Sequence, residues 1–252
     1  MITRSQLREI HRIELPLHIL EQDYIQSLFL NELYRKERSL VFKGGTYLKH
    51  AFGLDRFSED LDFTLYDEVD IEKILDDVSD RLTYYGVEAE IDRVEDQEIS
   101  LNARLRYRGP LFDGSEKSIG RINIEISKRE DVLLEPEWTR LFFEYPESRV
   151  LSALGLQKKE VLAEKLRALS SRSKGRDLYD VWFLLKQDTP LNKELFIEKM
   201  EVVGGSGEVS ISISAEGWWR DLEVLLVNPP KYDDVKKEVV QTLSENGFEV
   251  SI

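Results

Sequence analysis

Two aspartates spaced two residues apart, Asp60 and Asp62, are the residues of this sequence best suited to chemistry. Alternate residues of a β-strand face the same side. The apolar pattern of residues 61–65 therefore predicts a strand that presents both carboxylates on one face, together with Ser58 and Thr64. Carboxylates about 7 Å apart repel each other unless a cation lies between them, and a hard divalent ion accepts oxygen ligands. The alternative is an edge strand that exposes its acids to water.

A third carboxylate follows from the same alternation. Residues 121–127 alternate isoleucine with polar residues, which places Glu125 beside Arg121 and Asn123 on the polar face. If this strand lies next to Asp60 and Asp62, three carboxylates meet in one patch. Such a trio can hold two metal ions, one activating a hydroxyl and one binding a triphosphate. The alternative role for Glu125 is a surface ion pair with Arg121.

Two consecutive glycines, Gly44 and Gly45, lie where an apolar strand over residues 39–42 passes into a short helix over residues 47–52. Glycine lets backbone amides approach a ligand closely, and a helix N-terminus favours phosphate. The sequence contains neither GxxxxGK[ST] nor GxGxxG, so a P-loop and a Rossmann fingerprint are both excluded.

The composition excludes several classes of site. The 252 residues include no cysteine and three histidines, which argues against a disulfide scaffold, a thiolate zinc site, a cysteine nucleophile and a histidine-built metal site. No segment approaches the roughly 18 apolar residues of a membrane helix, and no signal peptide is evident. We expect a soluble, cytoplasmic protein that does not contact a membrane.

The net charge of −14 taken alone argues against a nucleic-acid partner. It is unevenly distributed, because residues 59–98 hold sixteen acidic and three basic side chains. Residues 101–129 and 158–176 are each net positive. Arg104, Arg106 and Arg108 alternate on a predicted strand and could follow a nucleic-acid backbone, although neutralising the acidic segment is slightly favoured.

The elements that must position these residues follow from hydrophobic periodicity. Helices are expected over residues 17–37, 47–52 and 71–85, and strands over 39–42, 61–65, 87–91, 99–107 and 118–126. Residues 131–147, bracketed by prolines, are interpreted as a connector that packs between lobes. Helical spacing then returns at 158–169, 177–185, 192–202, 216–227 and 233–246. The fold class is α/β (α+β), with a mixed-sheet lobe over residues 1–148 and a helical lobe over residues 149–252.

Several side chains have competing interpretations. In the helix over 158–169, three leucines are expected to pack while Lys165 and Arg172 point away; the leucines are Leu162, Leu166 and Leu169. A cationic cluster suited to phosphate is expected around the end of this helix, formed by Lys158, Lys165, Arg172, Lys174 and Arg176. Asp177 would cap the next helix, hold Lys165, or do both. The four tryptophans are expected to lie in the core or at a lobe interface rather than to serve as base-stacking platforms, and His50 is expected to have a packing role.

Two blocks of sequence closely resemble the AbiEii/AbiGii toxin family of DNA polymerase β-like nucleotidyltransferases, which includes the mycobacterial MenT toxins. The first runs from VFKGGTYL at Val41 to RFSEDLDF ending at Phe63. The second is EVLAEKLRAL at Glu160, followed by RDLYD at Arg176. The blocks are long, ordered and correctly spaced, and the resemblance spans about residues 20–190.

The resemblance implies a bilobal fold with a nucleotide between the lobes, and it implies roles for individual residues. Asp60 and Asp62 would bind Mg²⁺, with Glu125 as a further ligand or base, although the wider superfamily usually has Asp there. Lys165 and Asp177 match functional residues of the second block. The expected nucleotide contacts are Lys43, Gly44, Gly45, Thr46, Arg56, Ser58 and Arg176.

The favoured hypothesis is a Mg²⁺-dependent enzyme that moves NMP from an NTP to an acceptor hydroxyl. The family suggests RNA, in particular the tRNA 3′ end, as the acceptor, and a toxin role opposed by a winged-helix antitoxin. One alternative keeps the same machinery with a protein or small-molecule acceptor. Another is a catalytically silent NTP-binding module that acts through protein contacts.

Overall fold

The structure, a computed structural model, describes residues 1–11, 15–129, 132–172 and 174–252. The chain divides into two compact units. Unit 1 comprises Met1–Val132 and Pro136–Gly155, and unit 2 comprises Leu133–Glu135 and Leu156–Ile252. No helix within the described ranges combines the length and apolar character that a membrane crossing requires.

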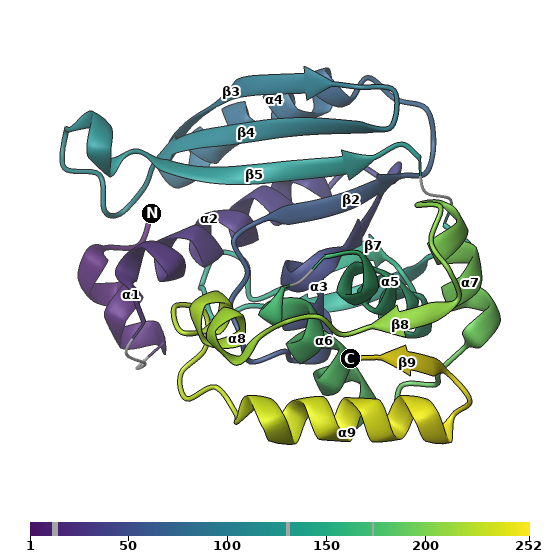
Figure 1. Cartoon of the computed structure of the whole chain (residues 1–252). Helices are drawn as coiled ribbons and strands as arrows, with labels where there is room; N and C mark the ends of the chain where they lie inside the picture. Colours follow the sequence, from purple (N-terminus) through teal and green to yellow (C-terminus); the bar gives the residue numbers. More distant parts are fainter. Residues whose placement is uncertain (12–14, 130–131, 173) are drawn as a thin grey trace. The chain divides into compact units, whose positions relative to one another are not determined.

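Unit 1 is built on a seven-stranded mixed sheet with the order β3-β4-β5-β2-β1-β7-β6 (Figure 1). Strand β2 lies near its centre, parallel to β5 on one side and antiparallel to β1 on the other. The strands are β1 (Leu40–Lys43), β2 (Leu61–Leu65), β3 (Glu88–Asp96), β4 (Ser100–Arg108), β5 (Gly120–Ser127), β6 (Glu137–Phe142) and β7 (Val150–Gly155). The predicted mixed α/β fold class is confirmed.

Helices of unit 1 cover one face of this sheet. They are α1 (Arg4–His11), α2 (Leu17–Leu33), α3 (Gly44–Phe52) and α4 (Ile71–Arg81), and the short 3₁₀ segments are η1 (Leu82–Tyr85) and η2 (Glu116–Ser118). In Figure 1, α2 and α4 lie behind β3, β4 and β5. Ile122, Ile124 and Ile126 of β5 are buried, whereas Asn123 and Glu125 are exposed. The alternation predicted for residues 121–127 is therefore confirmed through Glu125, and Ser127 departs from it because it is buried.

Unit 2 is mainly helical, as its periodicity predicts. Its helices are α5 (Lys158–Ser171), α6 (Gly175–Lys186), α7 (Lys193–Glu201), α8 (Ala215–Leu222) and α9 (Tyr232–Glu245). Two short strands that periodicity does not predict, β8 (Glu208–Ser210) and β9 (Glu249–Ser251), pair in parallel. Three-residue strands give too few alternations for a pattern to be visible in the sequence.

The interpretation of residues 131–147 as a connector is wrong for its central part. Residues 137–142 form the edge strand β6, which pairs antiparallel with β7. Strand β7 follows the predicted boundary at residue 148 and belongs to unit 1. Pro136 and Pro146 are typical of loops, but both lie outside the paired residues. They therefore do not interrupt the hydrogen bonds between β6 and β7. Glu130 and Asp131 lie outside the described residues.

A buried polar network fixes α3 against α2. Asp23 of α2 accepts hydrogen bonds from His50 Nε2 of α3 at 3.1 Å and from the Tyr145 hydroxyl at 2.7 Å. Burial alone would raise the pKa of the Asp23 carboxyl, but Lys49 and His50 hold it below its ordinary value. His50 also stacks on Phe143 with 4.0 Å between ring centroids, which confirms its packing role.

A second buried carboxylate of α2 makes the stability of the fold depend on pH. Glu21 is 3% exposed, and its Oε1 accepts a hydrogen bond from the Leu111 amide at 2.6 Å. Burial raises the pKa of Glu21 to about 7, despite the opposing hydrogen bond. The folded state therefore favours the neutral acid, and stability from this group falls as pH rises from 4.5 towards 7.

The variant Glu21→Gln should be more stable than wild type at pH 8 by about 2 kcal/mol, because it removes the cost of the buried charge while retaining an oxygen acceptor. At pH 4 the two proteins should have similar free energies of unfolding. Urea denaturation at both pH values measures this, with the exposed Glu68→Gln as control. An equal change in the free energy of unfolding at both pH values would contradict a raised pKa at Glu21.

Candidate active site

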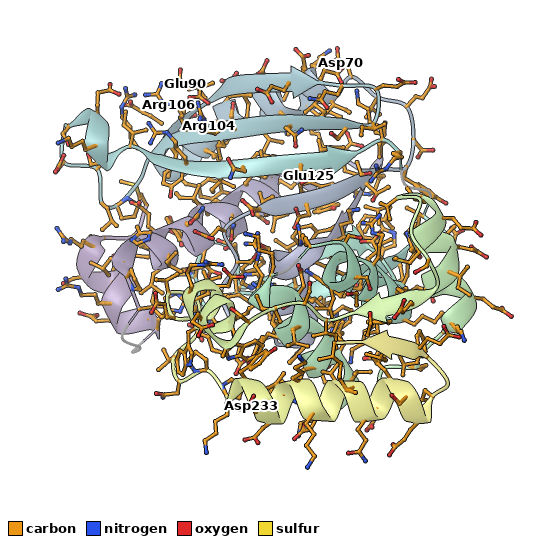
Figure 2. The ribbon with its side chains drawn as sticks, viewed as in Figure 1. Asp70, Glu90, Arg104, Arg106, Glu125 and Asp233 are labelled. Atoms are coloured by element: carbon orange, nitrogen blue, oxygen red, sulfur yellow. The ribbon has the colours of Figure 1, made fainter. Side chains whose placement is uncertain are left out.

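The carboxylates predicted to do chemistry lie on adjacent strands of the unit 1 sheet. Asp62 of β2 and Glu125 of β5 are direct partners in the parallel register (Figure 2 labels Glu125). Asp60 immediately precedes β2, and its Oδ1 accepts a hydrogen bond from Asn123 Nδ2 at 3.1 Å. The two strands are therefore neighbours, which is the condition under which the three carboxylates meet. Thr64 departs from the expected open face because it is 1% exposed on a central strand.

Gly44 makes room for Asp62. It has a φ of +78°, and a Cβ built on it would lie 1.9 Å from Asp62 Oδ2. Only glycine combines this left-handed backbone with the missing side chain that such close approach requires. Gly45 is similarly constrained, since its Cβ would lie 2.6 Å from Ser58 Oγ and 2.8 Å from Arg56 Nη2. The two glycines therefore bring a helix N-terminus against the carboxylate strand.

Helix α3 begins at Gly44, three residues before the predicted start. Gly44, Gly45 and Thr46 thus form its first turn, and no side chain caps it. The amides of a first helical turn have no partner within the helix, and the helix dipole favours an anion there. This arrangement suits phosphate binding next to Asp62.

The carboxylates border an open hollow of about 340 Å³. Its lining residues come from β2, β3, β4, β5 and the position directly before β2: Asp60, Asp62, Glu95, Asn102, Ala103, Arg104, Asn123, Ile124 and Glu125. No three His, Cys, Asp or Glu side chains in the described part of the chain are arranged as a complete metal site. Asp60 and Asp62 still fit Mg²⁺, since this ion is commonly bound by one or two carboxylates and completed by substrate phosphates and water. The space at Gly44 leaves one carboxylate oxygen of Asp62 at the helix N-terminus.

The other expected nucleotide contacts in unit 1 have mostly supporting positions. The Thr46 hydroxyl donates to the Asp60 carbonyl at 2.6 Å, so it anchors the backbone of a carboxylate. Arg56 is 1% exposed beneath Gly45 and donates to the Phe57 carbonyl. Ser58 and Lys43 are each 9% exposed, and Lys43 is the register partner of Asp62. These buried positions favour a structural role, in which the side chains support the first turn of α3, over direct contact with a nucleotide.

In unit 2, Lys165 is buried and does not point away as expected. Its Nζ lies 2.7 Å from Asp180 Oδ2 in an ion pair between α5 and α6. Leu162, Leu166 and Leu169 are buried as predicted. Lys165 turns inward because Asp180, one turn after Asp177 on the same helix, is fully buried and needs a cationic partner.

Asp177 has a different partner from the one predicted. It accepts two hydrogen bonds from Arg172, at 2.7 and 2.9 Å. It is not the N-cap, because α6 begins at Gly175 and Lys174 occupies the cap position. Arg176 lies half-buried in the first turn of this helix. The RDLYD segment therefore carries two acids that each hold one cation of α5 or its C-terminal end.

The predicted cationic cluster around the end of α5 is divided. Lys158 lies at the first residue of the helix, where its Nζ donates to Gln187 Oε1. Arg172 is engaged with Asp177, and Lys165 with Asp180. A helix of fourteen residues is about 21 Å long, so its two ends cannot share a phosphate.

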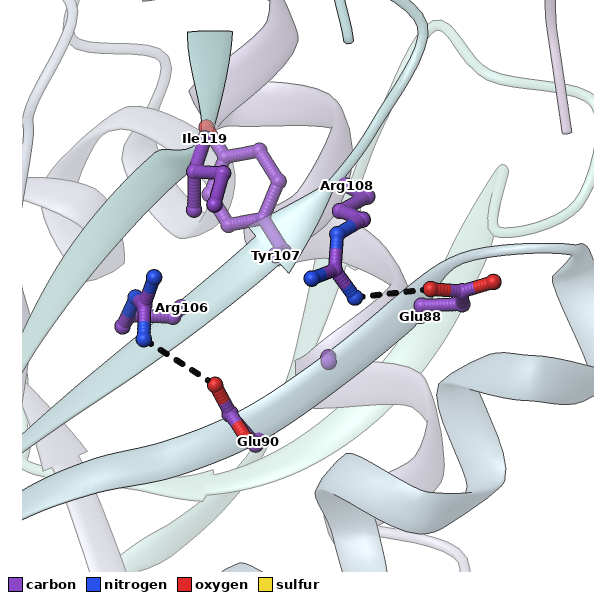
Figure 3. A pocket seen from close by; sticks show the side chains of 7 residues that line it. Glu88, Glu90, Arg106, Tyr107, Arg108 and Ile119 are labelled. Carbon is purple, nitrogen blue, oxygen red and sulfur yellow. Dashed lines mark hydrogen bonds and ion pairs between the residues drawn. The ribbon is translucent and has the colours of Figure 1, made fainter. Parts of the chain in front are cut away.

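The arginines of β4 neutralise acidic neighbours, as slightly favoured from sequence. Arg104 pairs with Asp92, Arg106 with Glu90 and Glu116, and Arg108 with Glu88. Figure 3 shows two of these contacts, Arg106–Glu90 and Arg108–Glu88, across strands β3 and β4. The hydrogen bond from Arg104 lowers the pKa of Asp92. Charge on this strand is therefore largely compensated within the sheet.

Two residues of structural importance to the site were not assigned roles from sequence. Asn123 orients Asp60, and its position two residues before Glu125 on the polar face of β5 was a usable signal. Asp180 holds Lys165, and its three-residue spacing from Asp177 on a predicted helix placed the two acids near one face. Trp138 and Trp219 depart from the expected packing roles, with exposed fractions of 50% and 49%.

Replacing Gly44 by Ala should displace Asp62 as well as strain the backbone. Gly53 provides a matched control, because it has a φ of +79° and a Cβ added there would meet no atom within 4 Å. Both variants should lose about 1 kcal/mol from the positive φ. Only Gly44→Ala should also weaken divalent-ion and nucleotide binding, measured by calorimetric titration. Equal binding by the two variants would contradict close packing of Asp62 on Gly44.

The Lys165–Asp180 and Arg172–Asp177 ion pairs of unit 2 should contribute different amounts to the free energy of unfolding. Asp180→Ala leaves the 10%-exposed Lys165 side chain without its acid and should cost about 3–5 kcal/mol in unfolding free energy. Asp177→Ala leaves Arg172, whose side chain is 50% exposed and can be hydrated, and should cost about 1–2 kcal/mol. Chemical denaturation measures the free energy of unfolding of both variants. A larger loss in Asp177→Ala than in Asp180→Ala would contradict this prediction.

Comparison with known proteins agrees with the motifs. Residues 28–249 match the family model described as nucleotidyl transferase AbiEii toxin, type IV toxin–antitoxin system. A search of curated proteins gave no match. The fold is similar to MenT4, a nucleotidyltransferase toxin from Mycobacterium tuberculosis, with a TM-score of 0.69, 19% identity, and coverage of 96% of this chain and 88% of that one.

It is also similar to JHP933 from Helicobacter pylori, with a TM-score of 0.57, 18% identity, and coverage of 92% of this chain and 96% of that one. At these sequence identities the similar structures show only that the fold is shared. The family assignment rests on the family model, which covers most of the sequence. The chain therefore belongs to the AbiEii family of nucleotidyltransferase toxins of type IV toxin–antitoxin systems.

Proposed function

We propose that this nucleotidyltransferase moves NMP from an NTP to a hydroxyl of RNA, at the 3′ end of a tRNA, in a Mg²⁺-dependent reaction. The observation that carries the proposal is the packing of Asp62 against Gly44. This packing places a carboxylate, a side chain that commonly binds metal ions, beside the first turn of α3. That turn has no side-chain cap, and an uncapped helix N-terminus is a common phosphate-binding site. The proposed metal ligand and the proposed triphosphate ligands would thereby be adjacent.

Asp60 and Asp62 would hold the ion, with Glu125 as a further ligand or a base. Nucleotidyltransferases generally use divalent metal ions, and oxygen donors are the preference of Mg²⁺. When bound, the ion would polarise phosphate oxygens and lower the pKa of the acceptor hydroxyl. Asn123 keeps the Asp60 carboxylate oriented through its amide, and Thr46 holds the Asp60 backbone.

The proposed reaction forms a bond between the acceptor oxygen and the α-phosphorus and breaks the bond from that phosphorus to pyrophosphate. Glu125 is exposed on the face of Asp62 and could accept the hydroxyl proton. The first-turn amides of α3 would stabilise the charge that develops on the phosphate oxygens. Pyrophosphate leaves with the electron pair of the broken bond.

The roles proposed for residues of unit 2 rest on the resemblance of the second sequence block to the family. Lys165 and Arg176 would compensate triphosphate charge, Lys165 being held by Asp180. Asp177 would fix Arg172 as a further cation of this region. Because Lys165 and Arg172 are oriented by the buried acids Asp180 and Asp177, their positions in unit 2 are defined before a ligand arrives.

The proposed biological context is a cytoplasmic toxin, because NTP and tRNA are both found there, opposed by a cognate winged-helix antitoxin. The type IV family supports an antitoxin partner. A protein or a small molecule remains the alternative acceptor. An NTP-binding module without catalysis is disfavoured, because Asp60, Asp62 and both glycines of the family motif are present, and Asp62 packs against Gly44.

The test is incubation with each α-labelled NTP, Mg²⁺ and tRNA, followed by analysis of the label. Wild type should label the RNA, and Asp60→Asn and Asp62→Asn should each lose more than about 100-fold in rate because a metal ligand is removed. Asp67→Asn, an exposed acid just after β2, is the matched control. Label on a protein or small molecule alone, or equal rates for Asp60→Asn and wild type, would refute the proposal.

A further inference from the structure

One face of the edge strand β6 is exposed and alternates aromatic with basic side chains. Trp138, Arg140 and Phe142 lie on this face, and the two rings are 50% and 58% exposed. Thr139 and Leu141 lie on the opposite face, where Thr139 meets the Tyr47 hydroxyl of α3 at 3.1 Å. Since α3 covers only that opposite face, the aromatic face lacks a covering helix of unit 1.

The strand register places this face on the same side of the sheet as Asp62. Phe42 of β1 is the partner of Gly155, so Lys43, the partner of Asp62, lies on the other side from Gly155. Trp138 pairs with Leu154 and therefore shares the side of Asp62. Strand β6 lies three strands from β2, about 14 Å at the usual spacing. One polynucleotide could contact both.

Arg140 lies on this face, and Arg38 lies beside it. Arg140 is exposed, and its guanidinium has no ion-pair partner among the residues that the structure describes. The Arg38 guanidinium lies 4.5 Å from the centre of the Trp138 ring and donates to the carbonyls of Tyr34 and Glu37. The arginines of β4, in contrast, are all paired with carboxylates.

A hollow of about 400 Å³ adjoins Trp138. Arg35, Arg38, Val150 and Ser152 contribute to its lining. Arg35 is paired with the buried Glu32 at 3.4 Å, but its own side chain is 61% exposed. An aromatic ring, an open hollow and guanidinium groups at one place match a nucleobase with its flanking phosphates.

We propose that Trp138, Arg140, Phe142 and Arg38, together called the β6 platform, bind a single-stranded segment of the acceptor RNA. Bases stack on the two rings, and Arg140 and Arg38 contact phosphates. The inference rests on the proposed function, since it assigns a contact surface to the RNA acceptor. A second copy of the chain fits less well, because two chains that each carry a net charge of −14 repel each other.

The experiment measures the affinity of the full chain for a labelled tRNA by fluorescence anisotropy at several salt concentrations. Trp138→Ala should weaken binding about fivefold or more through lost stacking. Arg140→Glu should weaken it similarly and should reduce the salt dependence, because fewer counterions are released. Phe142→Ala gives a second stacking variant, so that the conclusion does not depend on one substitution.

Matched controls lie elsewhere on the chain. Trp219→Ala in α8 removes an equally exposed tryptophan, and Arg8→Glu in α1 makes the same charge change at another exposed arginine. Both should bind tRNA as wild type does. Circular dichroism and NTP binding should be unchanged in every variant, which separates loss of the surface from loss of the fold.

Transfer of label from NTP to tRNA is measured in parallel. If wild type labels tRNA but Trp138→Ala and Arg140→Glu bind it with unchanged affinity, the β6 platform is refuted and the proposed function stands. If wild type neither binds nor labels tRNA, both fail. A change of oligomeric state in Trp138→Ala by light scattering, with RNA affinity unchanged, would identify the platform as a protein interface and overturn the inference.

Discussion

The packing of the Asp62 carboxylate against the α-carbon of Gly44 is the constraint on which the site depends. No side chain fits between them, and the φ of +78° at Gly44 turns the chain from β1 directly into α3. The same turn brings the first helical amides to the carboxylate strand. Asn123 and Thr46 then fix Asp60 from two directions. A local backbone requirement thus sets the geometry of both the proposed metal ligands and the proposed phosphate ligands.

The surrounding fold keeps this turn in register. Strand β1 is held between β2 and β7, and α3 is tied to α2 through the buried contact between His50 and Asp23. The pairing of Asp62 with Glu125 follows from the parallel register of β2 with β5. The buried charges of unit 2 serve a similar purpose, since Asp180 fixes Lys165 in one place. Polar groups that would be costly alone are satisfied in pairs, and this favours a single arrangement.

Much of the unit 1 site could be predicted because its signals are local. The spacing of Asp60 and Asp62, the alternation around Glu125 and the glycine pair each report a backbone geometry within a few residues. Features that depend on partners distant in sequence were missed. Helical periodicity predicts an outward Lys165 because it does not reveal the partner Asp180. The prolines around β6 favour a connector because the sequence pattern does not reveal its pairing with β7. The exposure of Trp138 likewise depends on which face of β6 is covered by α3.

The most direct test of the central claim is to locate a bound ion relative to Gly44 and Asp62. In the presence of Mn²⁺ and a non-hydrolysable NTP, paramagnetic broadening of backbone amide signals would report the nearest residues. The account predicts that broadening centres on Gly44, Leu61 and Glu125 in wild type and is lost in Asp62→Asn. Broadening centred elsewhere in the chain, or retained in Asp62→Asn, would contradict it.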